Sequence, residues 1–185
     1  MMASLPNFLT IARMVALVPI VVLLIDGDPW ARWAALAIFC AAAATDALDG
    51  WLARRMNARS TLGRVLDPIA DKVLVCGVIV VLTATLDAPA VAALVIVIRE
   101  LFVCGLRESL AASSLTVDVT AFSKFKTVLQ CAAIALVLIP DPAFATAGLV
   151  AMWLAALVTA LSGLLHGRAA WRALTAQRRS LSEEP

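Results

Sequence analysis

The sequence predicts an all-α polytopic membrane protein with six membrane-spanning helices, and three observations support this prediction. First, 63% of the 185 residues are hydrophobic, only 15% are charged, and the mean hydropathy is +0.96. A soluble domain carries about a quarter charged residues, so such a composition requires lipid as the main solvent. Second, the apolar residues form runs long enough to cross a bilayer. Third, the cations gather beside alternate breaks between these runs.

The apolar runs define the expected elements, since a spanning helix needs about 20 mostly apolar residues. Six runs approach this length: 8–25, 32–53, 66–86, 88–110, 122–139 and 144–166. The breaks at 26–29, 87–89 and 140–142 would lie on one side of the membrane. The breaks at 54–64 and 113–123 and the segment from Gly167 would lie on the other. We expect one membrane domain over residues 1–176 and a short, frayed polar tail over residues 177–185.

The distribution of cations predicts the orientation. Of the 15 lysines and arginines, Arg32 alone is next to a break of the first kind. Positive charge is retained on the cytoplasmic side during membrane insertion. Both termini are therefore expected in the cytoplasm, with the protein in the cell (inner) membrane.

Four carboxylates flank the break at 54–64. Asp46 and Asp49 are three residues apart, and Asp67 and Asp71 are four apart, so each pair would share one helix face. Carboxylates are costly within a membrane and usually mark function there. Two divalent cations would offset their mutual repulsion and form a clamp for a phosphate group. Ligands that are all oxygen favour Mg²⁺ or Mn²⁺.

Small and basic residues surround these carboxylates. Gly50 and Ala53 share a helix face with Asp46, which leaves room for a bulky ligand, although small residues also serve helix packing. Arg54 is placed to meet a phosphate, and Gly63 could let a connecting loop approach a nucleotide. Three more cations in this segment fit the role of topology determinants: Arg55, Arg59 and Arg64.

This segment resembles the signature D-x-x-D-G-x-x-A-R-x8-G-x3-D-x3-D of the CDP-alcohol phosphatidyltransferases. All eight fixed positions match: Asp46, Asp49, Gly50, Ala53, Arg54, Gly63, Asp67 and Asp71. Residues 5–13 are similar to the amino-terminal segment of that family. Arg99-Glu100, Arg107 and the run 123–127 resemble the phosphatidylglycerophosphate synthase branch, although Ser123 stands where the branch often has glycine.

The resemblance implies a homodimer of six-helix subunits, each with a polar cavity open to the cytoplasm. It also implies two Mg²⁺ or Mn²⁺ ions on the four aspartates, with Asp71 as the general base. The residues alone do not separate Asp71 from Asp67 in that role. The implied contacts to the CDP group are Asn7, Gly50, Ala53, Arg54, Thr61 and Gly63.

The implied reaction joins CDP-diacylglycerol to glycerol 3-phosphate, giving phosphatidylglycerophosphate and CMP, with membrane lipids as the other partners and no nucleic acid. Within the family, the alternatives are phosphatidylinositol phosphate synthase and cardiolipin synthase. An ion-coupled transporter is a more distant alternative. Transporter sites tend to lie at the midplane between repeated halves, whereas these acids cluster at the cytoplasmic end and no repeat is visible.

The acceptor pocket is sought among the remaining cations. Arg99 follows about eleven apolar residues, roughly 16 Å into its helix, where an arginine needs a polar cavity or a partner. Three other cations could join it around a phosphorylated alcohol: Arg107, Lys124 and Lys126. The alternative is that Arg99 pairs with Glu100 or Glu108 and that the lysines are ordinary interface residues. The lone His166 is expected at a membrane interface, and the four cysteines are expected to be buried and free.

Overall fold

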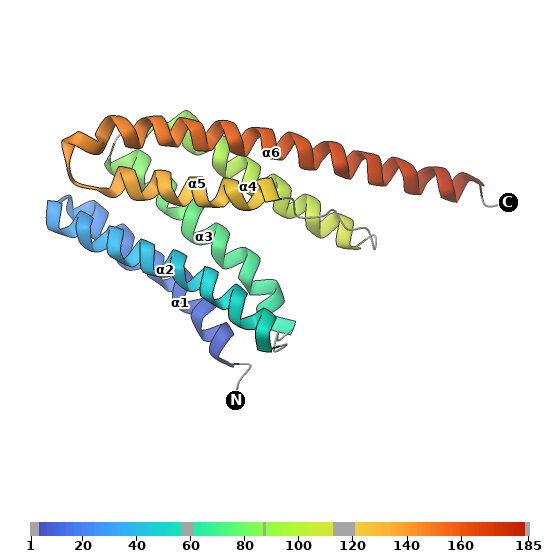
Figure 1. The fold of residues 1–185 in the computed structure, drawn as a ribbon, viewed down its shortest axis with the longest axis horizontal. Coiled ribbons are helices and arrows are strands. Elements are labelled where there is room, and N and C mark those ends of the chain that lie inside the picture. Colours follow the sequence, from blue (N-terminus) through green and yellow to red (C-terminus); the bar gives the residue numbers. More distant parts are fainter. Residues whose placement is uncertain (1–3, 57–60, 87, 113–120, 184–185) are drawn as a thin grey trace.

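The fold is a bundle of long helices (Figure 1). A computed structural model describes the backbone of residues 4–56, 61–86, 88–112 and 121–183, and over these residues it contains six helices and no strand. The helices are α1 (Ser4–Asp26), α2 (Pro29–Met56), α3 (Thr61–Thr85), α4 (Ala90–Ala112), α5 (Ala121–Leu138) and α6 (Pro142–Glu183). The all-α prediction is therefore confirmed, and each predicted run corresponds to one helix.

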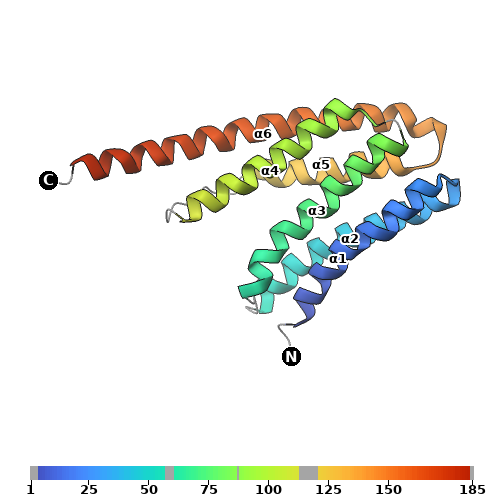
Figure 2. The same cartoon turned by 180° about the vertical axis from the view of Figure 1, so that it is seen from behind.

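The helices pack in two groups that share α3. Helix α1 packs against α2 and α3, and α6 packs against α4 and α5, while α3 also contacts α4 and α5. Helices α1, α3 and α5 end, and α2, α4 and α6 begin, at one pole of the bundle (Figures 1 and 2). Toward the other pole, where both chain termini lie, the helices diverge. The core contains Ile20, Phe39, Ile79, Ile134 and Met152, from five different helices, all at most 1% exposed.

The turn between α1 and α2 follows from its sequence. Gly27 has a φ of +78°, a left-handed conformation that glycine adopts at no steric cost at a helix end. Asp28 caps α2, because its Oδ1 accepts a hydrogen bond of 3.0 Å from the amide of Trp30. Pro29 is the first helical residue, where a missing amide proton costs nothing.

The start of α6 uses the same local chemistry. Asp141 Oδ1 accepts a hydrogen bond of 2.9 Å from the amide of Ala143, and Pro142 is the first residue of the helix. These two aspartates therefore serve as helix caps at the pole opposite the chain termini.

Arg32 joins the start of α2 to the end of α5. Its Nη2 donates hydrogen bonds of 3.0 Å to the carbonyl oxygens of Val137 and of Ile139. Carbonyls at a helix C-terminus lack partners within the helix, and a cation there also favours the helix dipole. This contact explains why one cation is found on a side of the molecule that is otherwise poor in positive charge.

Large apolar side chains are exposed on every helix, as expected for a protein surrounded by lipid. Examples, one from each helix in order, are Val18, Trp33, Val80, Leu94, Val128 and Leu157. Within the described residues, the stretch Pro142–Ala176 of α6 is the one that is long and apolar enough to cross a membrane, and an 18-residue window in it has a mean hydropathy of 2.1. Lys72–Thr85 of α3 forms a shorter apolar stretch.

Two boundaries differ from expectation. Helix α3 begins at Thr61, so Gly63 lies in its first turn and not in a connecting loop. The apolar spacing of Leu62, Val65 and Ile69 continues the helical period upstream of the predicted run. Helix α6 continues to Glu183 through the segment expected to fray, because the glutamine, arginines, leucine and glutamate of that segment are good helix formers. Arg59 and residues 113–120 lie outside the described residues.

The surroundings of the histidine and the burial of the cysteines were also predicted incorrectly. His166 is buried within α6, not at an interface, and its Nδ1 lies 2.7 Å from the carbonyl oxygen of Ser162, one turn earlier. None of the four cysteines forms a disulfide, as predicted, but Cys40 is exposed on the apolar surface of α2 and the other three are only partly buried.

Candidate active site

The four aspartates lie on α2 and α3 at matching depths. Asp46 and Asp49 are ten and seven residues before the end of α2, and Asp67 and Asp71 are six and ten residues after the start of α3. At 1.5 Å per residue, all four lie about 9–15 Å from the helix ends that face the 57–60 connection. That connection can separate the two ends by at most about 18 Å. Both helices also pack against α1.

This backbone arrangement fits a shared metal site. Each aspartate pair falls within a regular helix, where spacings of three and four residues keep side chains on one face. Helices α2 and α3 run in opposite directions (Figure 1), so the pairs lie at one level of the bundle. A donor set made only of carboxylate oxygens suits hard divalent cations. The side chains of the four aspartates themselves lie outside the described part of the structure.

The residues expected to contact CDP come from the same three helices. Asn7 is in α1, Gly50, Ala53 and Arg54 are in α2, and Thr61 and Gly63 are in α3. Their side chains also lie outside the described part, so the structure gives their order along the helices only. Because α1 packs against both α2 and α3, residues of all three helices can border one ligand.

The four expected acceptor cations separate into two classes. Arg99 on α4 is 7% exposed and Lys126 on α5 is 1% exposed, whereas Arg107 and Lys124 are exposed. The structure therefore brings together Arg99 and Lys126, deep in the bundle. Arg107 and Lys124 lie at the surface.

Arg99 and Lys126 meet at one carboxylate, that of Glu100. Glu100 Oε1 accepts hydrogen bonds from Lys126 Nζ, from Arg99 Nη1 at 3.1 Å, and from Gln130 Nε2 at 3.2 Å. Glu100 Oε2 forms an ion pair with Lys72 Nζ of α3. Glu100 is 1% exposed, so this is a buried ionic network that joins α3, α4 and α5. A buried charge is tolerated only where it is paired in this way.

Polar groups of α6 extend the network. Gln130 Nε2 also donates to Thr159 Oγ1 at 2.9 Å, and Arg99 Nη2 donates to Ser162 Oγ at 2.7 Å. Thr159 and Ser162 are fully buried, so their hydroxyls require such partners. We call the set Lys72, Arg99, Glu100, Lys126, Gln130, Thr159 and Ser162 the Glu100 network.

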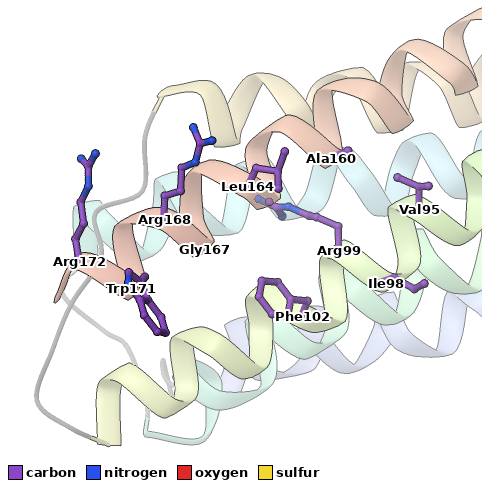
Figure 3. A pocket seen from close by; sticks show the side chains of 11 residues that line it. Val95, Ile98, Arg99, Phe102, Ala160, Leu164, Gly167, Arg168, Trp171 and Arg172 are labelled. Atoms are coloured by element: carbon purple, nitrogen blue, oxygen red, sulfur yellow. The ribbon is translucent and has the colours of Figure 1, made fainter. Parts of the chain in front are cut away.

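Gly163 gives Arg99 the space to reach this network. A methyl group at Gly163 would lie 2.9 Å from Arg99 Cγ, which is closer than real side chains approach. Figure 3 shows Arg99 extending from α4 toward α6 beside an open apolar groove. The groove has a volume of about 730 Å³ and includes Ile98, Phe102 and Leu164 in its lining. The stem of Arg99 therefore borders the apolar surface, while its guanidinium lies inside the bundle.

The sequence contained a signal for most of this network that we did not use. Lys126 and Gln130 are four residues apart, and Thr159 and Ser162 are three apart, in otherwise apolar runs. Such spacings place polar side chains on one helix face, which must then point into the bundle. Of the two carboxylates expected as alternative partners of Arg99, Glu100 pairs with it, whereas Glu108 is exposed.

Comparison with known proteins agrees with the signature. The sequence model of the family described as CDP-alcohol phosphatidyltransferase matches residues 3–161. A protein of Rickettsia bellii named CDP-diacylglycerol–glycerol-3-phosphate 3-phosphatidyltransferase is 36% identical over 171 residues, covering 90% of this chain and 94% of its own length. A Bacillus subtilis protein of the same name is 33% identical over 190 residues, covering 94% and 98%.

A relative with a different name is also similar. A cardiolipin synthase (CMP-forming) of Oryza sativa is 32% identical over 192 residues, which cover 92% of this chain and 58% of that protein. The family match spans most of the chain and includes all eight residues of the signature. The chain therefore belongs to the CDP-alcohol phosphatidyltransferase family.

Proposed function

We propose that this enzyme transfers the phosphatidyl group of CDP-diacylglycerol to glycerol 3-phosphate, forming phosphatidylglycerophosphate and releasing CMP. The observation that carries the proposal is the split signature, with two aspartates on α2 and two at the same depth on the antiparallel helix α3. The names of the Rickettsia and Bacillus relatives, which cover nearly the whole chain, support the choice of donor and acceptor.

The aspartates are proposed to hold two Mg²⁺ or Mn²⁺ ions. When bound, such ions would neutralise the diphosphate of the donor and stabilise the CMP that leaves. The acceptor hydroxyl is a weak nucleophile and needs a base within hydrogen-bond reach. We assign that role to Asp71, which would take the hydroxyl proton as the new phosphodiester bond forms.

The donor's CDP group is proposed to lie where α1, α2 and α3 meet. Gly50 and Ala53 are one and two turns beyond Asp46 on α2, and their small side chains would leave room for a nucleotide beside the helix. Arg54 would pair with a donor phosphate. Asn7, Thr61 and Gly63 complete the set that we assign to this group.

The acceptor phosphate is proposed to bind near Arg99 and Lys126. These two buried cations share one carboxylate, that of Glu100, so positive charge exceeds negative charge in this part of the bundle. A dianionic phosphate would offset that excess through charge-assisted hydrogen bonds. Arg107 and Lys124 are exposed toward the end of the bundle from which a water-soluble acceptor would enter, and we assign them to attracting and orienting it.

We further propose that helices α1 to α6 all cross the membrane, with both termini, the aspartates and a polar cavity on the cytoplasmic side, in a homodimer. Exposed apolar side chains on every helix support the multi-pass arrangement. The pole at which α2, α4 and α6 begin holds Arg32, whose charge is satisfied by helix carbonyls. That pole would therefore lie outside the cytoplasm.

An acceptor screen tests the proposed reaction. Purified protein in detergent, with CDP-diacylglycerol and Mg²⁺, should release CMP when glycerol 3-phosphate is added, and chelation of the metal should stop the release. Cardiolipin synthase is the second candidate because of the Oryza relative, and its acceptor is phosphatidylglycerol. Release of CMP with phosphatidylglycerol or inositol phosphate, but not with glycerol 3-phosphate, would refute the proposed acceptor.

A further inference from the structure

Glu100 is the centre of the buried network and contacts every cation within it. Its two carboxylate oxygens receive Lys72 from α3, Arg99 from its own helix, and Lys126 and Gln130 from α5. Three of these donors lie on Oε1, and Lys72 lies on Oε2. The carboxylate of Glu100 is therefore engaged through both oxygens by partners within the protein.

The network also fixes the place of Lys126. A lysine side chain has a flexible four-carbon stem, so the stem alone does not fix the position of its ammonium group. Here the side chain is 1% exposed and its ammonium is held by Glu100, which is itself held from α3 and α5. The anchoring carboxylate cannot move away easily, because three other donors would lose their acceptor.

The network also includes the residue that follows the candidate base on α3. Lys72, which pairs with Glu100, directly follows Asp71 on α3. One carboxylate on α4 thus connects the turn of α3 that carries Asp71 with the cation of α5 that we assign to the acceptor phosphate. In the proposed reaction, Asp71 and Lys126 act on the same acceptor molecule.

We infer that Glu100 is a positioning residue, whose carboxylate holds Lys126 in the place where it meets the acceptor phosphate. This inference rests on the proposed function. The competing possibility is that Glu100 occupies the cations in place of the phosphate and has to be displaced by it. The two roles predict opposite signs, because loss of a positioning residue weakens acceptor binding, whereas loss of a competitor strengthens it.

The experiment is a double-mutant cycle on full-length protein in detergent. It compares wild type with Glu100→Gln, Lys126→Met and the double variant, with KM measured for each substrate and the glycerol 3-phosphate dissociation constant measured by calorimetry. Loss of a charged hydrogen-bond partner corresponds to about a ten- to hundredfold weakening. Each single variant should raise the glycerol 3-phosphate KM by about that factor and leave the CDP-diacylglycerol KM within about twofold.

Coupling between the two residues is the decisive result. If Glu100 acts through Lys126, the double variant should be no worse than the worse single variant. Three results would each overturn the inference. The KM increases of the two single variants could multiply in the double variant, a variant could weaken both substrates equally, or Glu100→Gln could bind glycerol 3-phosphate more tightly. Glu108→Gln, an exposed carboxylate two turns along the same helix, is the matched control and should behave as wild type.

Folding and function can be separated in this design. If Glu100→Gln yields no folded protein, Glu100→Asp replaces it, since it keeps the charge but withdraws the carboxylate by one methylene. Glu100→Asp should raise the acceptor KM severalfold, and a wild-type KM would overturn the inference.

Failure of the proposed function can be told apart from failure of this inference. If wild type uses another phosphorylated alcohol, only the proposed acceptor fails, and the cycle is run with that alcohol. If wild type binds glycerol 3-phosphate without turnover, calorimetry still tests Glu100, and if it binds no phosphorylated alcohol, the inference fails.

Discussion

At the scale of single residues, the bundle contains charges that cannot be explained by topology alone. Arg99 and Lys126 are nearly inaccessible, yet each has a specific partner in Glu100, and Arg99 also donates to Ser162. The pairing of Arg99 with Glu100, which the sequence left open as an alternative to a substrate pocket, is present. Two cations share one carboxylate, so positive charge remains in excess, and the pairing is compatible with the proposed phosphate site.

The proposed base gives the first prediction. Replacing Asp71 with asparagine keeps the shape of the side chain and removes its negative charge. Transfer should fall by about 10²–10⁴-fold, the usual contribution of a general base, and any stabilisation of the fold by Mg²⁺ should weaken. CMP release and thermal unfolding with and without Mg²⁺ are the two measurements. Asp26→Asn, an exposed carboxylate at the far end of α1, is the control, and equal activity of the two variants would contradict the assignment.

The second prediction concerns the space beside Arg99. Gly163→Ala would place a methyl group 2.9 Å from Arg99 Cγ, and overpacking of this kind costs about 1–3 kcal/mol. Gly105→Ala on α4 is the matched control, because a methyl group there meets nothing within 4 Å and should stabilise the helix by about 0.5–1 kcal/mol. The midpoints of thermal unfolding should therefore move in opposite directions. A Gly163→Ala variant as stable as Gly105→Ala would show that Arg99 does not occupy this space.

At the scale of the helices, apolar run length predicted the number and order of the elements but not their ends. The apolar criterion detects only the lipid-embedded part of a helix, so α6 extends well beyond the run that ends at His166. It also missed the first turn of α3, where Gly63 lies in the helix and not in a loop. In both cases the helix extends beyond the apolar run, before it in α3 and after it in α6. Hydropathy does not detect such polar helical segments.

The candidate site was predictable to different degrees. The aspartate signature could be identified from one sequence because it is a local pattern with fixed spacings. The Glu100 network combines residues of four helices, from Lys72 to Ser162. Which buried polar groups meet depends on how helices pack, so the sequence indicated candidate faces, such as Lys126 with Gln130, but not their partners.

The third prediction belongs to the contact between α2 and α5. Arg32→Met keeps the apolar stem and removes two charged hydrogen bonds to the end of α5. Hydrogen bonds from charged groups contribute about 1.5–3 kcal/mol, so the free energy of unfolding should fall by about that amount. Arg172→Met, an exposed arginine of α6, should change stability by less than about 0.5 kcal/mol. Chemical unfolding in mixed micelles measures both, and equal stability would mean that the hydrogen bonds of Arg32 add nothing to stability.

At the scale of the whole molecule, length and charge together determine how the bundle sits in a membrane. Helix α6 has 42 residues, which corresponds to about 63 Å at 1.5 Å per residue, whereas the hydrocarbon core is about 30 Å thick. Its apolar stretch starts at Pro142, so the excess length lies toward the C-terminus, where Arg168 and Arg172 are found. The second half of α6 should therefore project from the membrane on the cation-rich side.

The last prediction is the orientation itself. Both termini lie at the diverging pole of the bundle (Figure 1), and basic residues near span ends are retained in the cytoplasm. A fluorescent protein that matures only in the cytoplasm should therefore fluoresce when fused before Met1 or after Pro185. A phosphatase that is active only outside the cytoplasm should be active when inserted at Gly27 or at Asp141, which lie in the α1–α2 and α5–α6 turns of the opposite pole. Phosphatase activity at Pro185 together with fluorescence at Gly27 would reverse the orientation and place the aspartates out of reach of cytoplasmic glycerol 3-phosphate. Activity at the terminus and at both turns would instead mean that fewer helices cross the membrane than we propose.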